Sequence, residues 1–230
     1  MTRYLITAAI ALIGGFLGAW LFALSGLGGQ ATRDWLLDHP EILPQMADRY
    51  QKYESAQRLA AVGGDLAEAF PGAVLGNPAG KTVLVEFSDY GCTFCRQSVA
   101  EVKAMIAADP DLRVVVREWP IFPGSDVAAR MALAAAKQGK YAAFHDAMFA
   151  AGPPSTATIQ AAAQAAGLDM EAARTFGASP EVTLELRKNA EIAQRLGFEG
   201  TPSWIAGGQV FSGAVGRARL VEALRDQTGT

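Results

Sequence analysis

The chain has 230 residues, of which 50% are hydrophobic and 19% are charged, and its net charge is −3. This length suffices for one domain of ordinary size together with additional segments. The sequence has no basic stripe or Lys/Arg block, which argues against a nucleic-acid partner, and its 2 cysteines are too few for a small disulfide-stapled fold.

An uncharged, apolar run extends from Tyr4 to Leu24. As a helix it would be about 31 Å long, which is enough to cross the hydrocarbon core of a bilayer. Arg3 precedes the run and favours a cytoplasmic N-terminus. The run is longer than the apolar region of a typical signal peptide, which favours an uncleaved anchor, but the small residues around Ala31 leave a cleaved signal open. With either outcome, the remainder of the chain is exported.

A helical segment is expected after this run. Residues 26–30, Gly-Leu-Gly-Gly-Gln, predict a flexible linker. Thr32 is expected to cap a short helix that ends near Pro40, where a second helix begins. The second helix carries apolar residues at three- to four-residue spacing: Ile42, Met46, Tyr50, Tyr53 and Leu59. This apolar face either docks on its own domain or pairs with the same face of another subunit, so residues 32–61 are candidates for homo-oligomerisation.

The compact domain is expected to begin with an α/β unit. After a short strand at residues 72–76, the β-branched, apolar run 81–90 is typical of a buried strand. A helix follows and ends before Pro110, and residues 111–120 form a second buried strand. Strand, helix and strand joined by short connections predict a βαβ unit, whose two strands lie parallel and side by side.

The next stretch is mainly helical. Residues 125–197 are alanine-rich and are punctuated by glycine and proline, which predicts several helices. Strand signals return at residues 202–213, with a tight turn at Gly207 and Gly208. A closing helix is expected over residues 215–227.

Both cysteines of the chain, Cys92 and Cys95, lie in a Cys-Thr-Phe-Cys motif at the junction between the first buried strand and its helix. A C-x-x-C at this place in a βαβ unit is the context of a thioredoxin-type redox site. Free N–H groups and the dipole at the helix start stabilise a thiolate at Cys92. Cys95, one turn further on, can form a disulfide with Cys92 and resolve a mixed disulfide with a substrate.

Two thiols can also serve as metal ligands or remain as inert buried groups. A structural zinc site needs about four ligands, and the only histidines are His39 and His145, of which His145 is expected to be a packing residue. No zinc site and no cofactor are therefore predicted. Two thiols can bind Cu(I), so a copper-binding module is an alternative. Inert buried thiols are disfavoured because an exported protein meets an oxidising compartment.

The sequence resembles the DsbA-like thiol–disulfide oxidoreductases of the thioredoxin superfamily over about residues 75–228. The resemblance is carried by Val-Glu-Phe-Ser-Asp-Tyr-Gly-Cys-Thr-Phe-Cys ending at Cys95, by Gly-Thr-Pro-Ser-Trp at 200–204, and by the long helical stretch between them. It implies a thioredoxin-like α/β fold with an inserted helical domain, preceded by a transmembrane or signal helix and an amphipathic helical segment.

The resemblance also implies a division of the chain into four parts. They are a membrane anchor or signal with its linker (1–30), an N-terminal helical segment (31–70), a thioredoxin-like domain (71–124 with 198–230) and the helical insertion (125–197).

By this resemblance, Cys92 is the nucleophile and Cys95 is the resolving thiol. Thr201 and Pro202 form a cis-proline loop that lies against the pair. Glu86 lies in the apolar middle of the first buried strand, and a buried carboxyl group with a raised pKa can relay a proton to the resolving thiol.

Substrate contacts are expected close to the cysteines. Thr93, Phe94 and Trp204 are assigned to substrate binding, and Phe94 is expected to line a hydrophobic groove with Trp119, Phe122 and Trp204.

The resemblance implies an enzyme on the periplasmic side of the inner membrane, held by residues 4–24 or released there by cleavage. Its substrates would be unfolded or misoxidised exported proteins, and a membrane redox partner would reset the cysteine pair. The Thr93-Phe94 dipeptide carries no positive charge, and Thr201 before the proline resembles isomerase-type members. Disulfide isomerase or reductase activity, in an oligomer assembled through residues 32–61, is therefore the alternative.

Overall fold

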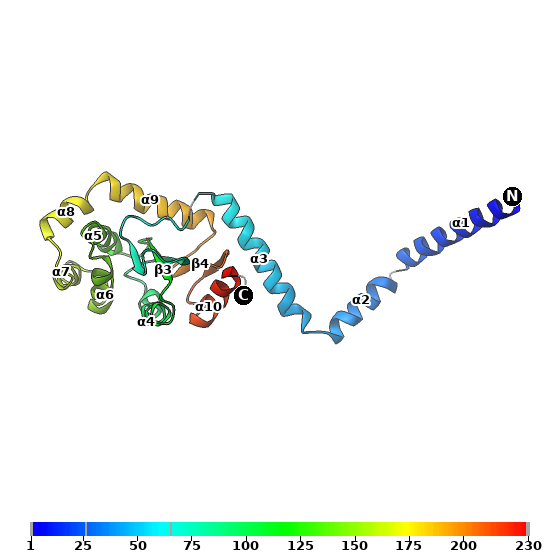
Figure 1. The fold of residues 1–230 in the computed structure, drawn as a ribbon, viewed down its shortest axis with the longest axis horizontal. Coiled ribbons are helices and arrows are strands. Elements are labelled where there is room, and N and C mark those ends of the chain that lie inside the picture. The colour runs from blue at the N-terminus through cyan, green and yellow to red at the C-terminus, as the bar shows by residue number, and fades with distance from the viewer. Residues whose placement is uncertain (1, 26, 65, 229–230) are drawn as a thin grey trace. The chain divides into compact units, whose positions relative to one another are not determined.

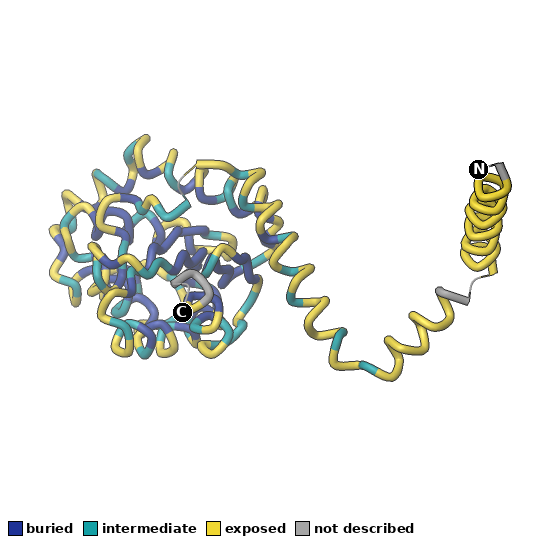
Figure 2. Tube along the Cα trace, turned by 45° about the vertical axis from the view of Figure 1, so that its right-hand side comes forward, coloured by how far each residue is buried: buried dark blue, intermediate teal, exposed yellow. Residues whose placement is uncertain are grey.

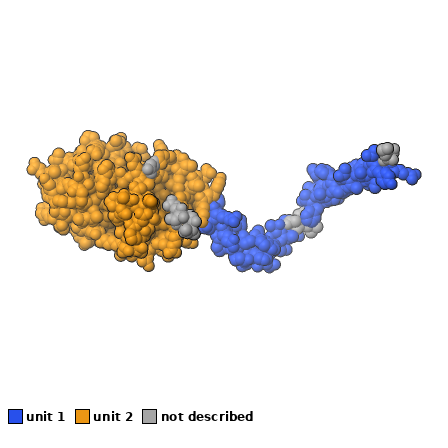
Figure 3. Space-filling model, viewed as in Figure 1, with its two compact units in different colours: residues 1–50 blue, residues 51–230 orange. Residues whose placement is uncertain are grey.

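The computed structural model of the chain describes residues 2–25, 27–64 and 66–228. The chain divides into two units, Met1–Tyr50 and Gln51–Thr230, which are distinguished by colour in Figure 3. The first unit contains α1 (Thr2–Leu24), α2 (Leu27–Asp38) and the start of α3 (Ile42–Val62).

Helix α1 is exposed along its described length, as Figure 2 shows. Its segment Arg3–Leu24 is the one helix of the described residues that is long and apolar enough to cross a membrane. A helix that is apolar on all sides is typical of a membrane span or a signal sequence.

The structure corrects two predictions about the segment that follows. Residues 27–30, expected in a flexible linker, form the first turn of α2; Gly26 lies outside the described residues. Thr32 lies inside α2 and is not its N-cap. A glycine in a helix costs only about 1 kcal/mol relative to alanine, so the glycines here do not stop a helix that the leucines and alanine around them favour.

The second unit is built on a five-stranded sheet (Figure 1). The strand order is β1-β3-β2-β4-β5. The strands are β1 (Val74–Gly76), β2 (Thr82–Ser88), β3 (Leu112–Glu118), β4 (Ser203–Ala206) and β5 (Gln209–Ser212). β2 and β3 are parallel and are linked by α4 (Thr93–Ala108), which confirms the predicted βαβ unit, while the other neighbouring pairs are antiparallel.

Five helices lie between β3 and β4 in the chain. They are α5 (Ser125–Lys137), α6 (Tyr141–Ala151), α7 (Thr156–Ala165), α8 (Met170–Gly177) and α9 (Pro180–Arg195), and α10 (Arg217–Thr228) closes the fold. The face of α5 that packs inward is rich in buried alanines, and side chains this small let neighbouring helices approach closely. The fold is therefore thioredoxin-like α/β with a helical insertion.

Side-chain alternation along β2 and β3 gives the sheet two buried faces. One face carries Leu84, Val114 and Val116 and packs on a cluster that includes both cysteines. The other face carries Val85, Phe87 and Val115 and packs on residues of α9 and on Leu59 and Val62 of α3. Covering both faces explains why these strands read as continuous apolar runs.

Only part of the apolar face predicted for α3 is buried in the structure. In the part of α3 that belongs to the second unit, Leu59 is half-buried and Ser55 is fully buried. The hydroxyl of Ser55 accepts the backbone N–H of Val210, in the edge strand β5, at 3.2 Å. In contrast, Met46 and Tyr53 are exposed. The predicted apolar face thus docks on its own domain only near its C-terminal end.

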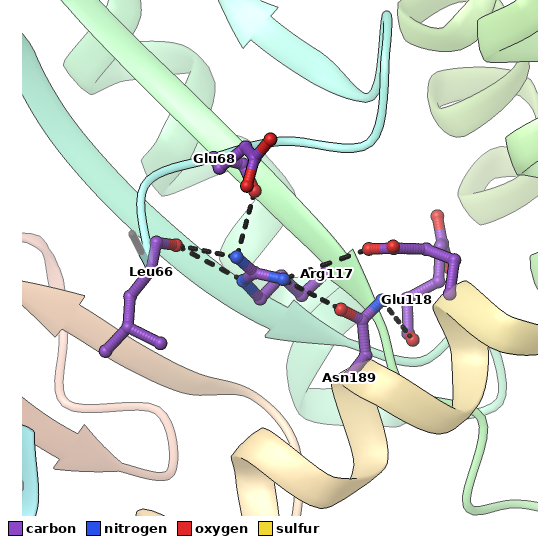
Figure 4. A network of polar contacts seen from close by, with 6 residues as sticks. Leu66, Glu68, Arg117, Glu118 and Asn189 are labelled. Atoms are coloured by element: carbon purple, nitrogen blue, oxygen red, sulfur yellow. Dashed lines mark hydrogen bonds and ion pairs between the residues drawn. The ribbon is translucent and has the colours of Figure 1, made fainter. Parts of the chain in front are cut away.

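A buried arginine joins the segment after α3 to the sheet and to α9 (Figure 4). The guanidinium of Arg117, in β3, donates to the carbonyl oxygens of Leu66 and Glu68, each at 2.9 Å, through Nη2. Its Nη1 donates to Oδ1 of Asn189 at 2.9 Å and lies 3.8 Å from Oε1 of Glu185. Arg117 therefore holds three separate parts of the second unit together.

Candidate active site

The cysteine pair lies where the chain leaves β2 and enters α4. Cys92 is the N-cap residue of α4, in an extended conformation, and its Sγ accepts the backbone N–H of Cys95 at 3.3 Å. Both cysteines are buried and are present as free thiols. The positive end of the helix dipole thus points at the sulfur of Cys92.

The loop before β4 lies against Cys92. The Thr201-Pro202 peptide bond is cis, as predicted. The thiol of Cys92 donates to the carbonyl oxygen of Thr201 at 3.1 Å. Residues more than one hundred positions apart in the sequence are thereby brought into direct contact.

Glu86 is buried on the face of β2 that carries Leu84 and packs toward the cysteines. Burial raises its pKa to about 8, although a hydrogen bond from Ser88 opposes the shift. Burial also raises the pKa of the Cys95 thiol; the charge of Glu86 raises it further, while the Thr201 hydroxyl lowers it. A charge on Glu86 therefore helps to keep the proton on Cys95.

Asp89 was not predicted as a site residue, yet it fixes the loop that carries Cys92. Its buried carboxylate accepts the backbone N–H of Gly91 and of Ile121, each at 2.6 Å, and that of Phe122 at 2.9 Å. The Asp-x-Gly sequence is the signal that could have revealed it, because aspartate commonly bonds its own backbone two residues on.

Glu118, at the end of β3, was also missed. It is buried, and its Oε1 accepts hydrogen bonds from the phenols of Tyr90 at 3.0 Å and Tyr141 at 2.7 Å. Burial raises its pKa to about 8, and the two phenols oppose that shift. Tyr90 lies two residues before Cys92, so this acid touches the active-site loop directly.

The side chains next to the cysteines leave an apolar surface. Phe94 is 58% exposed, and Ile121 and Phe122 are each 43% exposed. A Cβ atom at Gly91 would lie 2.8 Å from Cβ of Phe122, so glycine permits this close approach. Thr93 is exposed beside Phe94. Phe94, Ile121 and Phe122 are called the apolar rim below.

Two tryptophans expected at this surface are in the core. Trp204 is fully buried, and its Nε1 donates to the carbonyl oxygen of Gly213 at 3.0 Å. Trp119 is also buried and packs edge-on against Phe87, with ring centroids 6.3 Å apart. The structure therefore does not bring these rings together with Phe94 at the surface.

Cys92 and Cys95 are the soft ligands that the site offers to a metal. Among the described residues, no group of three or more His, Cys, Asp and Glu side chains is placed to hold an ion. The chemistry that the arrangement supports directly is thiol–disulfide exchange.

Comparison with known proteins agrees with this geometry. The family model described as DSBA-like thioredoxin domain matches residues 83–225, which is more than half of the chain. A thioredoxin-like oxidoreductase from Silicibacter pomeroyi DSS-3 is 42% identical, with a TM-score of 0.65 over 68% of this chain and 92% of that one. A periplasmic thioredoxin-like protein from Salmonella enterica serovar Typhimurium is 26% identical, with a TM-score of 0.59 over 74% of this chain and 95% of that one.

Curated relatives match in a different way. A Na(+)/H(+) antiporter NhaA 1 from Salinispora arenicola is 26% identical over 145 residues, which is 61% of this chain but 22% of the antiporter. The chain thus spans less than a quarter of that relative, and the match concerns only that part of the antiporter.

Proposed function

The chain belongs to the DsbA-like thioredoxin family, and from this premise we propose that it catalyses thiol–disulfide exchange in exported proteins through Cys92 and Cys95. The observation that carries the proposal is the position of Cys92. Its sulfur accepts an N–H at the start of α4 and touches the carbonyl of Thr201. A sulfur held at a helix start, beside a backbone segment that an extended substrate can meet, is placed for thiol–disulfide exchange.

The exchange requires two steps. A substrate thiolate attacks Sγ of Cys92 in the oxidised pair, forms a mixed disulfide, and displaces Cys95 as a thiolate that takes up a proton. A second substrate thiolate then attacks the substrate sulfur of the mixed disulfide, which forms the substrate disulfide and releases Cys92 as a thiolate. Two electrons pass from the substrate to the pair, and a membrane redox partner would remove them. The reverse sequence reduces a substrate disulfide.

Glu86 fits the role of proton donor to Cys95. Cys95 leaves as a thiolate in a buried place, where its raised pKa makes protonation favourable. A carboxyl group with a pKa of about 8 still holds a proton at neutral pH and can share it with the leaving thiolate.

The apolar rim supports unfolded or misoxidised proteins as substrates. Unfolded chains expose apolar side chains, and Phe94, Ile121 and Phe122 offer exposed apolar area next to the reactive sulfur. Thr93 and the backbone at Thr201 would add polar contacts to an extended segment. Because Trp204 is buried, its proposed role is to support the loop of Thr201 and Pro202, and it does not contact the substrate.

The N-terminal helix supports a location at the membrane. Arg3–Leu24 is long and apolar enough to span a bilayer. We propose that it either anchors the enzyme with its catalytic domain on the periplasmic side or is cleaved after export, leaving the enzyme soluble in the periplasm.

A second candidate function is isomerase or reductase activity in a homo-oligomer. Leu43, Met46 and Tyr50 are exposed on α3 at the three- to four-residue spacing that helix pairing uses. Replacing Leu43 and Met46 with lysine should lower the mass measured by light scattering of the full chain in detergent. An unchanged mass would contradict assembly through this face.

The test of the main proposal uses the full chain purified in detergent. Cys92→Ser should abolish disulfide exchange with a reduced, unfolded substrate, and Cys95→Ser should accumulate mixed disulfides that survive acid quenching. Ser98→Ala, a change in the same helix without loss of a thiol, is the matched control and should retain activity. Exchange that persists without Cys92 would overturn the proposal. Mass tagging of the thiols in living cells then gives the direction: a mainly oxidised pair indicates an oxidase, and a mainly reduced pair indicates an isomerase or reductase.

A further inference from the structure

Two buried carboxyl groups lie on the same face of the sheet. In the parallel register, Glu86 of β2 is opposite Val116 of β3, and Ser88 is opposite Glu118. Because side chains alternate along a strand, Glu86, Ser88 and Glu118 all project to the face that packs on the cysteine cluster. Glu118 is therefore a near neighbour of Glu86, one step further toward the active-site loop.

Glu118 is held by groups from two other elements. Tyr90 donates to it from the active-site loop, and Tyr141 donates to it from α6. The charged groups that act on it are Asp89 and Glu86, both acidic. The His145 ring lies 5.9 Å, centroid to centroid, from both tyrosine rings, and its own burial lowers its pKa and keeps it neutral.

We propose that Glu118 is a positioning residue of the redox site, which controls the protonation of Glu86 and, through Glu86, the transfer of a proton to and from Cys95. This inference rests on the proposed exchange function. Two carboxyl groups that share a buried region do not ionise independently, and the pair loses its protons in two coupled steps. The charge on either carboxyl group keeps the proton on the other, and a proton kept on Glu86 is available to the leaving Cys95 thiolate.

The tyrosines connect this control to the active-site loop. Tyr90 is separated from Cys92 by Gly91 alone, and the N–H of Cys92 bonds to the carbonyl oxygen of Asp89. A rearrangement of the loop during exchange would therefore alter a hydrogen bond to Glu118. Tyr141 comes from the helical insertion, so the insertion also contributes to the chemistry of the cysteine pair.

The decisive measurement is the pH dependence of the rate at which Cys95 attacks a mixed disulfide at Cys92. The full chain in detergent is converted to the mixed disulfide between Cys92 and glutathione, and the release of glutathione by Cys95 is followed from pH 5 to 10. Glu118→Gln removes the neighbouring charge, so Glu86 becomes available as a base at lower pH. The midpoint of the rate profile should fall by about one pH unit.

Further variants guard against a purely structural effect. Tyr141→Phe keeps the ring but removes a donor that favours the ionised form of Glu118, so it should shift the midpoint in the same direction by a smaller amount. Glu185→Gln changes an acid that contacts Arg117, whose side chain lies on the opposite face of the sheet, and should leave the midpoint unchanged. If Glu118→Gln does not fold, Tyr141→Phe decides the matter.

The outcomes separate this inference from the proposed function. Active, folded Glu118→Gln and Tyr141→Phe proteins with wild-type midpoints would overturn the role of Glu118 and leave the exchange function in place. A wild-type protein that releases no glutathione would overturn the exchange function itself.

Discussion

The carboxylate of Asp89 accepts the backbone N–H of Phe122 at 2.9 Å, and so joins the loop that carries Cys92 to the loop that carries Ile121 and Phe122 of the apolar rim. The same oxygen accepts the N–H of Ile121. The reactive sulfur and the surface proposed to bind substrates are therefore held in a fixed relation by one side chain.

Asp89→Asn should weaken the connection between the loop of Cys92 and the loop of Ile121 and Phe122. The amide keeps the size of the side chain, but it removes the charge that strengthens three hydrogen bonds and turns one acceptor into a donor. We expect a loss of about 2–3 kcal/mol in the free energy of unfolding and slower exchange with protein substrates. Denaturant titration and exchange kinetics measure the two effects. Asp109→Asn, which changes a partly exposed aspartate with a similar backbone bond to Asp111, is the control and should cost less than about 1 kcal/mol.

Glu86 should make the stability of the protein fall as the pH rises. Its pKa of about 8 in the folded state exceeds the ordinary value of 4.5. The folded state therefore binds the proton more tightly than the unfolded state does. This contribution is fully present below about pH 4.5 and is lost as the pH rises through 8.

Glu86→Gln should consequently be more stable than the wild type at pH 8, by on the order of 2–4 kcal/mol, and nearly equal to it at pH 4.5. Denaturant unfolding of the reduced protein at both pH values measures this. Glu101→Gln, at an exposed position of α4, should show no such difference. A Glu86→Gln protein with the wild-type pH dependence would show that burial does not control this carboxyl group.

Phe94→Ala should weaken substrate binding without affecting the fold. The ring is 58% exposed, so its loss removes contact area for a substrate but little core packing. We expect KM for an unfolded substrate to rise about threefold to tenfold, consistent with about 1 kcal/mol of lost contact. Exchange with glutathione, which needs little apolar contact, should stay unchanged. Leu184→Ala, a similarly exposed residue of α9, serves as the control.

Arg117→Met should destabilise the second unit strongly. The change leaves the carbonyl oxygens of Leu66 and Glu68 and the amide of Asn189 without their buried donor. Removing one partner of such a buried network costs about 3–5 kcal/mol. Thermal unfolding measures the loss. Arg113→Met, on the same strand and the same face, should have a much smaller effect, and equal losses for both variants would contradict the clamp.

The βαβ unit, the helical insertion and the Cys92–Cys95 pair could be predicted because each has a local signal. Buried parallel strands read as continuous apolar runs, and helices are bounded by glycine, proline and capping residues. The contact between Cys92 and Thr201 was expected from the family resemblance, because no local pattern links residues so far apart.

Other features depend on packing that no local pattern reveals. All four residues of β4 are buried, so alternation could not show whether Trp204 faces a substrate or the core. Glu118 lies at the end of β3, and its partner Tyr141 comes from α6, which follows the intervening helix α5. The start of α2 was misjudged because glycines were read as a linker, although a helix tolerates them.

The bond between Ser55 and Val210 has a practical consequence for anyone who wishes to produce the catalytic domain alone. An unpaired edge strand recruits strands from other molecules, and here the helix whose Ser55 bonds to the edge strand is encoded well upstream of the family-matched region. A truncation that begins at the first strand would still contain every catalytic residue, yet it would leave β5 open to intermolecular pairing. Soluble, monodisperse material should therefore require a start no later than Gln51, the first residue of the second unit.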